Sequence, residues 1–427
     1  MKSFIYRLVA HNALTGLAAG LFLAIQGIFL LEKGVEIWQI GLLLGTYAVT
    51  AAIFELPLGA IADLYGRLKI YRLSRVVYIS GVALALFSDD LYGLIGAMVV
   101  MGISQAINTG TVDAWQVEQI NKKGHQESLQ SYLSLFEMAM AAFIALGAVV
   151  GGYLPELIDH SLLGVQTNWN LVAVLIVVGI HLMVSPFLFK EGESKVELSD
   201  EQRSVKGQIK IAVRYGLRNS TIRLLLLAGL VIGMAVANIE SFWQPQLISI
   251  DDDVSYSMFG WITMGYFATA IVGPMLTGIL GQLFGLKPRV FITVLPALSA
   301  TAVYFLASQN TIPGFVVFYF GFMLTFSMIN PAVSTELNAE TPDDVRSTML
   351  SVFSLSFMGG AVFSAYVLAP LAKSLGISQV WQIVAMALAL YSLLKVFQWV
   401  IQTITKKLAS SVSGSDVNEP LKPKSIA

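Results

Sequence analysis

Long apolar segments recur along the whole chain, and they constrain its fold more than any other feature. Each holds about 20 mostly apolar residues, enough for a helix to cross the hydrocarbon core of a bilayer. Because backbone polar groups in lipid must be hydrogen-bonded within such a segment, we predict that these segments are helices. Twelve are expected, at residues 4–31, 37–63, 70–87, 92–118, 129–154, 169–189, 222–249, 255–282, 289–308, 313–337, 347–372 and 379–404.

The composition is that of an integral membrane protein, and it excludes several kinds of site. Of the 427 residues, 56% are hydrophobic and 12% are charged, far from the balance of a soluble domain. The chain has no cysteine, so disulfides and thiolate metal sites are excluded, and its four histidines lack the spacing of metal ligands. We therefore predict no metal site and no cofactor. A net charge of −1 gives no reason to expect a nucleic-acid partner.

The placement of basic residues predicts the orientation of the chain in the membrane. Twelve spans put both termini on one side, and nearly all Lys and Arg residues fall in the termini and in the loops of that side. The exceptions are Lys33, Lys373 and Lys395. By the positive-inside rule, both termini are cytoplasmic. The first apolar run lacks a cleavage site, so we expect a retained helix and a multi-pass protein of the inner (plasma) membrane.

Two halves of the chain resemble each other. The sequence GAIADLYGRLKI at 59–70 aligns with GILGQLFGLKPR at 278–289, and SYLSLFEM at 131–138 aligns with SVFSLSFM at 351–358 at nearly the same offset. This repeat predicts an all-α membrane protein, with twelve transmembrane helices in two pseudo-symmetric six-helix bundles around a central cavity. In the second copy, Gln282 and Leu286 replace Asp63 and Arg67. The charged form of this motif therefore occurs only in the first half of the chain.

Polar segments mark the boundaries of the predicted parts. These parts are an N-terminal six-helix bundle (1–189), a cytoplasmic linker (190–221), a C-terminal six-helix bundle (222–405) and a disordered cytoplasmic tail (406–427). Within the linker, apolar residues such as Val205 and Ile209 share one helical stripe and basic residues share another, which predicts an amphipathic helix on the cytoplasmic leaflet. A simple tether between the two halves explains the same segment.

A motif after the second span carries a family resemblance. Gly59, Asp63, Gly66 and Arg67 match the signature G-x-x-x-D-x-x-G-R, in the loop where the major facilitator superfamily has it. With twelve spans and a central linker, the chain resembles this family over essentially its whole length. A longer match that begins at Glu55 is similar to bacterial efflux members of the tetracycline and macrolide kind.

The resemblance implies that this motif forms a cytoplasmic gate. An acid at the end of the second span can meet Arg67 and the positive end of a packed helix, and Gly59 leaves room for that helix. Near the cytoplasmic end of the fourth span, Asp113 and Glu118 are assigned to the gate because we expect them to pair with loop cations. The alternative is that the motif only sets topology, since basic residues are expected in any short inner loop.

A glycine-rich segment of the fifth span resembles the core of the family's antiporter signature. Gly147, Gly151 and Gly152 match G-P-x-x-G-G, with Ala148 in place of proline. Small residues at this spacing also allow close helix packing in any membrane protein, so both interpretations stay open. The fourth span lacks the arginine that drug–proton exchangers of the family often have. Proton coupling would therefore depend on other groups.

Ionisable residues inside the predicted spans are candidates for proton coupling, because a charge in hydrocarbon costs at least a few kcal/mol. Glu137 is the first candidate and Glu55 the second, each about 12 Å from the inner end of its helix. Glu240 and His11 complete the set. Each acid has the alternative of a static hydrogen bond to a neighbouring helix, and His181 is expected to be structural.

The sequence NIESFWQPQ around Glu240 suggests a substrate site. Aromatic and amide side chains beside an acid suit an aromatic or cationic ligand. An aromatic belt at the membrane interface, with the acid reaching water, explains the same pattern. Two residues of the first span are added because that span is expected to line the cavity. The predicted substrate-cavity residues are Asn12, Gln26, Asn238, Phe242, Trp243 and Gln244.

These features predict a transporter and not an enzyme. The sequence has no evident nucleophile and base pair and no phosphate-binding Gly-x-x-x-x-Gly-Lys motif. We expect a secondary active transporter that exports a lipophilic or cationic small molecule in exchange for protons, by alternating access. Its partners are expected to be substrate, protons and lipid, and the protein to be a monomer. The alternatives are a proton-coupled uptake symporter for a nutrient and a lipid flippase.

Overall fold

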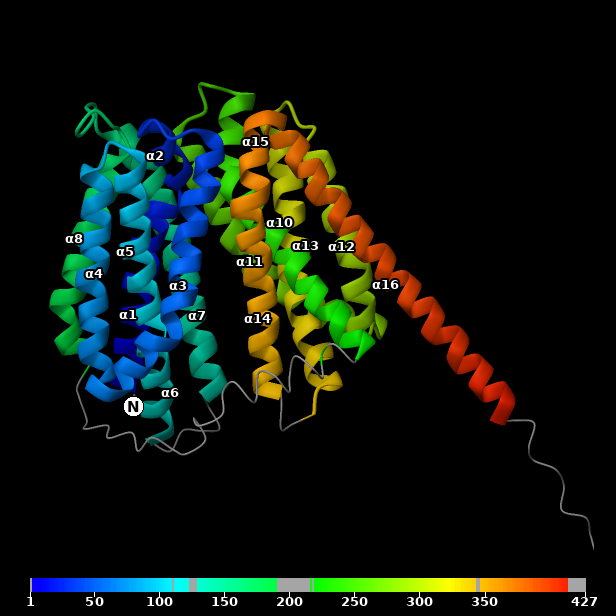
Figure 1. Cartoon of the computed structure of the whole chain (residues 1–427). Coiled ribbons are helices and arrows are strands. Elements are labelled where there is room, and N and C mark those ends of the chain that lie inside the picture. The colour runs from blue at the N-terminus through cyan, green and yellow to red at the C-terminus, as the bar shows by residue number, and fades with distance from the viewer. Residues whose placement is uncertain are drawn as a thin grey trace, which may run out of the picture.

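The helices of the computed structural model form two groups that stand side by side (Figure 1). The structure describes residues 2–109, 111–122, 129–189, 216, 219–342 and 346–413. The N-terminal group contains α1 (Lys2–Leu23), α2 (Gln26–Glu32), α3 (Ile37–Tyr65), α4 (Arg67–Phe87), α5 (Leu91–Thr109), α6 (Val112–Lys122), α7 (Leu129–Leu157) and α8 (Asn168–Leu188). The C-terminal group contains α10 (Ser220–Ile250), α11 (Tyr256–Phe284), α12 (Pro288–Leu306), α13 (Ile312–Glu340), α14 (Arg346–Phe363), the π-helix η4 (Ser364–Leu368), α15 (Ala369–Leu375) and α16 (Ile377–Ser413).

Within the described residues, 11 helices are long and apolar enough to cross a membrane. The number becomes 12 when α1 and α2, which meet at a bend of 43°, are counted as one broken span. The segment Thr348–Leu375, with the π-helix inside it, is one of these spans. The prediction of an all-α membrane protein built from two six-span bundles is confirmed.

The fourth predicted span and the predicted disordered tail differ from the helices of the structure. The predicted span 92–118 is two helices, because α5 ends at Thr109 and α6 begins at Val112. The sequence Thr-Gly-Thr at this point consists of weak helix formers. At the C-terminus, α16 continues to Ser413, so residues 406–413 of the predicted disordered tail are helical. Gly414 is the first strong helix breaker after the predicted span. Residues 414–427, and nearly all of the predicted linker, lie outside the described residues.

Glycines in the C-terminal half let α10 and α14 approach until their backbones touch. A Cβ added at Gly360 would lie 1.9 Å from the carbonyl oxygen of Leu230, and one added at Gly233 would lie 2.0 Å from that of Phe357. No other side chain fits at either position without moving a helix. The neighbouring Gly359 has nothing within 4 Å of an added Cβ.

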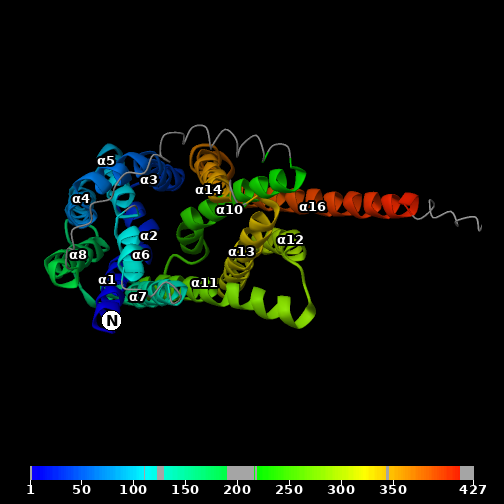
Figure 2. The same cartoon turned by 90° about the horizontal axis from the view of Figure 1, so that it is seen from below.

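The glycines of the antiporter-like segment make contacts of the same kind. A Cβ added at Gly147 or Gly151 would lie 2.4 or 2.6 Å from a backbone oxygen of α1. Gly152 faces the other half of the molecule, where its added Cβ would lie 3.0 Å from the Cα of Gly260 in α11. The segment therefore joins α7 to both α1 and α11, and seen from below, α7 lies beside α11 (Figure 2).

The two halves are joined at the end of the bundle that carries the loops 33–36 and 251–255. We call this the outer end, following the predicted orientation, and the opposite end the inner end. The Gln244 side chain accepts a hydrogen bond from the Gly27 backbone N–H (2.6 Å) and donates to the carbonyl oxygens of Leu23 (3.1 Å) and Ala24 (3.0 Å). Gln244 thus holds α10 against the bend between α1 and α2.

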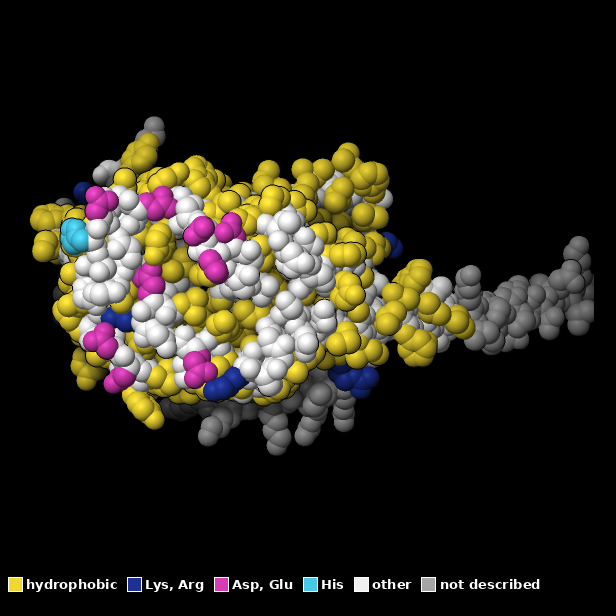
Figure 3. All heavy atoms as spheres, turned by 90° about the horizontal axis from the view of Figure 1, so that it is seen from above, with side chains coloured by type: hydrophobic (Ala, Val, Ile, Leu, Met, Phe, Trp, Pro, Cys, Tyr) yellow, Lys and Arg dark blue, Asp and Glu magenta, His cyan; other side chains and the backbone are white. Residues whose placement is uncertain are grey.

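Acidic residues of the N-terminal half add polar contacts across the outer end. Glu32 accepts hydrogen bonds from the Tyr256 hydroxyl of the other half (2.7 Å) and from the Thr167 hydroxyl (2.7 Å). Acidic side chains are spread over this face of the molecule (Figure 3). A further acid of the N-terminal half, Glu36, pairs with Lys373 of the other half at 3.1 Å.

The contribution of the Glu36–Lys373 ion pair to closure depends on pH. A hydrogen bond from Trp38 and the nearby Lys373 hold the pKa of Glu36 below its ordinary value of 4.5. A lowered pKa favours the charged form in the closed arrangement, so the pair contributes to closure above pH 4.5 and is lost as the pH falls further below that value. Both side chains are more than half exposed, so the pair is weak.

The inner end of the molecule has no comparable connection within the described residues. The hydrogen bonds and ion pairs that join described residues of the two halves all involve the outer parts of the helices. At the inner end, Gly59 and its counterpart Gly278 have no described atom within 4 Å of an added Cβ. The helix contact predicted at Gly59 is therefore not made among the described residues, which close this conformation at the outer end and leave it open at the inner end.

The Gly360 contact can be tested by a pair of neighbouring substitutions. Gly360→Ala places a methyl group against the α10 backbone, and we expect a loss of stability of about 1–3 kcal/mol. The melting temperature of the purified protein in detergent should fall by several degrees. Gly359→Ala, its matched control, should leave the melting temperature nearly unchanged. Equal effects of the two substitutions would show that the close contact does not limit stability.

The Tyr256 contact across the outer end predicts a change in accessibility. Tyr256→Phe removes a hydrogen bond to a carboxylate, and we expect the population open at the outer end to rise by roughly tenfold. An impermeant thiol reagent added from outside should then label Ala48→Cys faster, on this naturally cysteine-free chain. Tyr304→Phe, an exposed position away from the interface between the halves, serves as the control. Unchanged labelling in Tyr256→Phe would contradict this role.

Candidate functional site

A cavity of about 420 Å³ lies between the two halves, inward of the closed outer end. Its wall is formed by α1, α2, α3, α4 and α5 on one side and by α10, α14 and η4 on the other. Gly45 and Gly233 let the helices of this wall pack closely, since a Cβ added at Gly45 would lie 2.2 Å from the Ala365 Cβ and one added at Gly233 would lie 2.0 Å from the Phe357 carbonyl oxygen. The large side chains of the wall are apolar or aromatic: Phe22, Tyr47, Tyr78, Met98, Met101 and Phe357.

A second cavity of about 200 Å³ opens from the first into the C-terminal half. We call it the side chamber. Its own wall contains Trp243, Thr263, Tyr266, Phe267 and Tyr319. The ring of Trp243 lies 5.3 Å from that of Tyr319, a distance typical of paired aromatic side chains. The residues common to both cavities are Leu23, Gln26, Leu44, Glu240 and Ser241.

Glu240 lies at the junction of the two cavities. Its side chain is exposed to the cavity although it belongs to the middle of a long helix. One carboxylate oxygen, Oε1, accepts a hydrogen bond of 2.8 Å from the Tyr266 hydroxyl, and Oε2 has no partner among the described residues. Glu240 is the one Asp, Glu, Lys or Arg in the described walls of the two cavities. A carboxylate in such apolar surroundings attracts a cation or a proton.

The first two candidates for proton coupling lie away from these walls. The side chains of Glu137 and Glu55 are exposed, and neither has a hydrogen bond or ion pair with another described residue. Glu55 follows the wall residue Ala48 by seven residues, about two helical turns, so it lies on the same face of α3 closer to the inner end. Of the predicted acids, the structure thus places Glu240 in the cavity wall and Glu137 and Glu55 away from it.

His11 belongs to a buried cluster inside the N-terminal half. Its Nδ1 lies 2.9 Å from His181 Nε2, and the Tyr71 hydroxyl lies within 3.3 Å of both nitrogens. The guanidinium group of Arg75 lies 5.0 Å from the centre of the Tyr71 ring. His11, His181 and Tyr71 are each at most 4% exposed. The expectation that His11 faces the cavity is wrong, because the ring packs against α4 and α8.

Half of the predicted substrate-cavity residues line the two cavities: Gln26, Trp243 and Gln244. The other three predictions are wrong for this conformation. Asn238 is fully buried and donates a hydrogen bond to Ser364, and Phe242 is fully buried next to α3. Asn12 is buried and bonds to the carbonyl oxygen of Leu8. Neighbours in a helix point about 100° apart, so one short motif cannot face one cavity throughout.

The polar residues that α11 contributes to the side chamber were not predicted from the sequence. Thr263 and Tyr266 lie in an apolar span, where a hydroxyl group carries no charge that would mark it. The aromatic and methionine residues of the main cavity were missed for a related reason, since an apolar residue that faces a cavity looks the same in sequence as one that faces lipid. No signal in the sequence distinguishes these positions.

The predicted gate of the N-terminal half is partly described. Gly66 ends α3 with φ of 98°, in the region that favours glycine. The guanidinium group of Arg67 lies 3.3 Å from Glu118, which also pairs with Lys122 at 2.5 Å. Asp63 lies in α3 and Asp113 in α6, but their side chains are outside the described residues.

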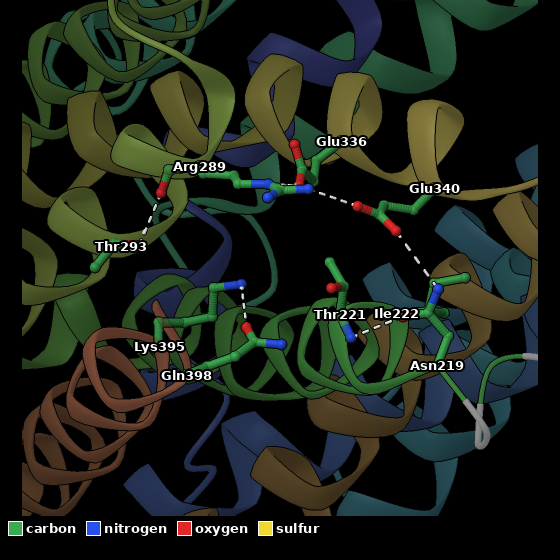
Figure 4. A network of polar contacts seen from close by, with 9 residues as sticks. All are labelled: Asn219, Thr221, Ile222, Arg289, Thr293, Glu336, Glu340, Lys395 and Gln398. Carbon is green, nitrogen blue, oxygen red and sulfur yellow. Dashed lines mark hydrogen bonds and ion pairs between the residues drawn. The ribbon is translucent and has the colours of Figure 1, made fainter. Parts of the chain in front are cut away.

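The C-terminal half has a charged network of its own at the inner end (Figure 4). Arg289 at the start of α12 donates hydrogen bonds to Glu336 and Glu340 at the end of α13. The motif itself keeps its charged form only in the first half, since Leu286 takes the place of Arg67 in the second copy. Arg289, three residues after Leu286, supplies the cation of this network.

Two neighbours complete this network. Asn219 caps α10 by accepting a hydrogen bond from the Thr221 backbone N–H (2.8 Å), and its side-chain amide points toward Glu340 (Figure 4). Lys395 of α16 is buried and donates to Gln398 at 3.0 Å. The network thus brings polar groups of α10, α12, α13 and α16 together at the inner end.

Comparison with known proteins agrees with this architecture. The chain is 25% identical over 384 residues to an uncharacterised MFS-type transporter, YxaM, of Bacillus subtilis (strain 168), across 89% of this chain and 92% of that protein. It is 27% identical over 169 residues to the class B tetracycline resistance protein of Escherichia coli, across 39% of each.

Solved structures show the same fold. The crystal structure of the nucleoside transporter NupG matches with a TM-score of 0.76 at 11% identity, and the match covers 93% of this chain and 99% of that one. A bacterial homologue of the human lysosomal transporter Spinster, in an inward-facing and unoccupied conformation, matches with a TM-score of 0.66 at 16% identity, over 93% and 95% of the two chains.

The sequence model of the Major Facilitator Superfamily matches residues 10–251 and again residues 225–426. The two matches correspond to the two halves of the fold and together cover nearly the whole chain. YxaM, NupG and the Spinster homologue are each described as transporters. The fold of this chain supplies apolar helices for a membrane and a cavity between two halves. This chain is a membrane transporter of the major facilitator superfamily and not an enzyme.

Proposed function

We propose that this transporter exports a lipophilic cation in exchange for a proton, by alternating access. The observation that carries the proposal is the position of Glu240, a carboxylate at the junction of two largely apolar cavities. The main cavity is closed at the outer end and open toward the inner end in this conformation. A substrate therefore enters from the inner side, which the loop charges predict to be the cytoplasm.

The walls of the main cavity favour a lipophilic substrate. Aromatic and methionine side chains supply apolar contact, and methionine adapts to ligands of different shape. The volume of about 420 Å³ is within the usual range for a drug-sized ligand. A positive charge on the substrate is favoured because it would pair with Glu240 in largely apolar surroundings.

The polar groups of the cavity argue against a sugar-like nutrient as substrate. Ser241 and Ser364 carry hydroxyls in the wall, but each is already hydrogen-bonded inside the protein, to the Ala237 oxygen and the Asn238 side chain. Gln26 is the one amide of the main wall within the described residues. Besides Glu240, the other polar side chains of the described main wall are Tyr47 and Tyr78. So small a polar set in a largely apolar cavity supports export of a lipophilic compound over nutrient uptake.

Exchange follows from competition for one carboxylate. With the inner end open, a cation that binds Glu240 displaces its proton toward the cytoplasm. With the outer end open, a proton from outside displaces the cation. One monovalent cation exchanged for one proton moves no net charge, so each pH unit supplies about 1.4 kcal/mol, a tenfold substrate gradient. Glu55 and Glu137, closer to the inner end, are secondary candidates for carrying the proton.

The proposal is tested by pH-driven transport in proteoliposomes. A panel of lipophilic amines is supplied against an imposed pH gradient, for the original protein and for Glu240→Gln. We expect the substitution to abolish pH-driven accumulation, because its amide neither ionises nor pairs with a cation. Asp159→Asn, which removes an exposed acid near the outer end, is the control for loss of charge and should transport normally.

Parallel measurements on Glu55→Gln and Glu137→Gln identify the proton carrier. We expect both variants to keep at least part of the pH-driven accumulation. Full pH-driven accumulation in Glu240→Gln, together with its loss in Glu55→Gln or Glu137→Gln, would show that the cavity acid is not the coupling site. Accumulation of the amine in the more alkaline compartment, the side toward which protons flow, would identify a symporter instead.

A further inference from the structure

We propose that the side chamber is an amine site that selects substrates bearing an N–H group on the positively charged nitrogen. This inference rests on the proposed function, because it specifies the class of cation that Glu240 pairs with. The amine nitrogen is placed in the side chamber, and the lipophilic remainder of the substrate in the main cavity. Glu240, at the junction, contacts the nitrogen.

The Thr263 hydroxyl is the first observation behind this inference. The residue is 4% exposed, it lines the side chamber, and its buried Oγ1 has no hydrogen-bond partner among the described residues. Several other helical threonines, such as Thr277 and Thr301, donate to the carbonyl oxygen four residues earlier. A buried hydroxyl without a partner costs free energy, so a ligand group that bonds to it gains affinity.

Glu240 provides a second vacant acceptor beside the chamber. The Tyr266 hydroxyl occupies Oε1 of its carboxylate, which leaves Oε2 without a partner among the described residues. The chamber therefore presents a carboxylate oxygen and a hydroxyl oxygen that are both able to accept hydrogen bonds. A protonated amine carries the matching donors, whereas a quaternary ammonium group carries the same charge and no donor.

Aromatic rings make the chamber suitable for a positive charge. Trp243 and Tyr319 lie in its wall with ring centres 5.3 Å apart, and Tyr266 and Phe267 lie in the wall with ring centres 4.8 Å apart. Ring faces attract cations, with or without N–H groups. The volume of about 200 Å³ is less than that of typical drug sites, so the chamber holds a head group and not a whole lipophilic compound.

Binding of a matched pair of compounds tests the inference. The probes are one lipophilic tertiary amine, protonated at the working pH, and its N-methyl quaternary analogue, measured by equilibrium binding to purified full-length protein in detergent. We expect Thr263→Val to weaken binding of the amine by roughly tenfold and to leave binding of the quaternary analogue unchanged. Thr263→Ser keeps the hydroxyl and should retain the affinity for the amine.

A matched control is available on the same helix. The Thr269 hydroxyl already donates to the carbonyl oxygen of Tyr266 and lies outside both cavities, so Thr269→Val should change neither affinity. Melting temperatures of all variants separate local effects from misfolding. An unchanged amine affinity in folded Thr263→Val, or an equal loss for both compounds, would overturn the inference.

The same experiment separates this inference from the proposed function. We expect Glu240→Gln to weaken binding of both compounds, since both carry the positive charge. If Glu240→Gln weakens both and Thr263→Val weakens neither, the amine site is wrong and the cation site stands. If Glu240→Gln changes neither affinity, the proposed function fails together with the inference that rests on it.

Discussion

Contact between the two halves at their outer ends determines the rest of this structure. Gly152 and Gly260 let α7 and α11 approach closely, and Gln244 bonds to the backbone at the bend between α1 and α2. Because these contacts join only the outer parts of the helices among the described residues, the cavity behind them is closed on one side. Alternating access requires the outer contacts to break when inner ones form. Weak and replaceable polar contacts such as that of Glu36 with Lys373 suit this requirement.

The charge distribution divides the protein into regions with different tasks. At the inner end, Arg67 and Arg289 pair with acids in the two halves, so each charge is compensated and serves helix packing. In the cavity, Glu240 meets a neutral tyrosine hydroxyl and no cation among the described residues. An uncompensated carboxylate away from bulk water is costly, and a proton or a cationic substrate relieves that cost. This difference makes Glu240 the coupling candidate.

The fold could be predicted from sequence because a membrane leaves few options for long apolar segments. The repeat around Gly59 and Gly278 also indicated the two halves correctly. The site was less predictable, because it depends on which way each helix faces. Phe242 and Trp243 are adjacent, yet one packs in the core and the other lines the side chamber. Thr263 gave no signal, since a lone hydroxyl in an apolar span is common, and its importance depends on a missing partner that only the structure reveals.

The most direct test of alternating access is the distance between the inner ends of the two halves. Leu64 and Leu283 are exposed equivalents in the repeat, so spin labels at Leu64→Cys and Leu283→Cys report on this distance without disturbing packing. Pulsed electron resonance on the protein in lipid should show two distance populations, and acidification or a lipophilic amine should change their ratio. A single distance distribution, unchanged by pH and by every amine tested, would contradict the account.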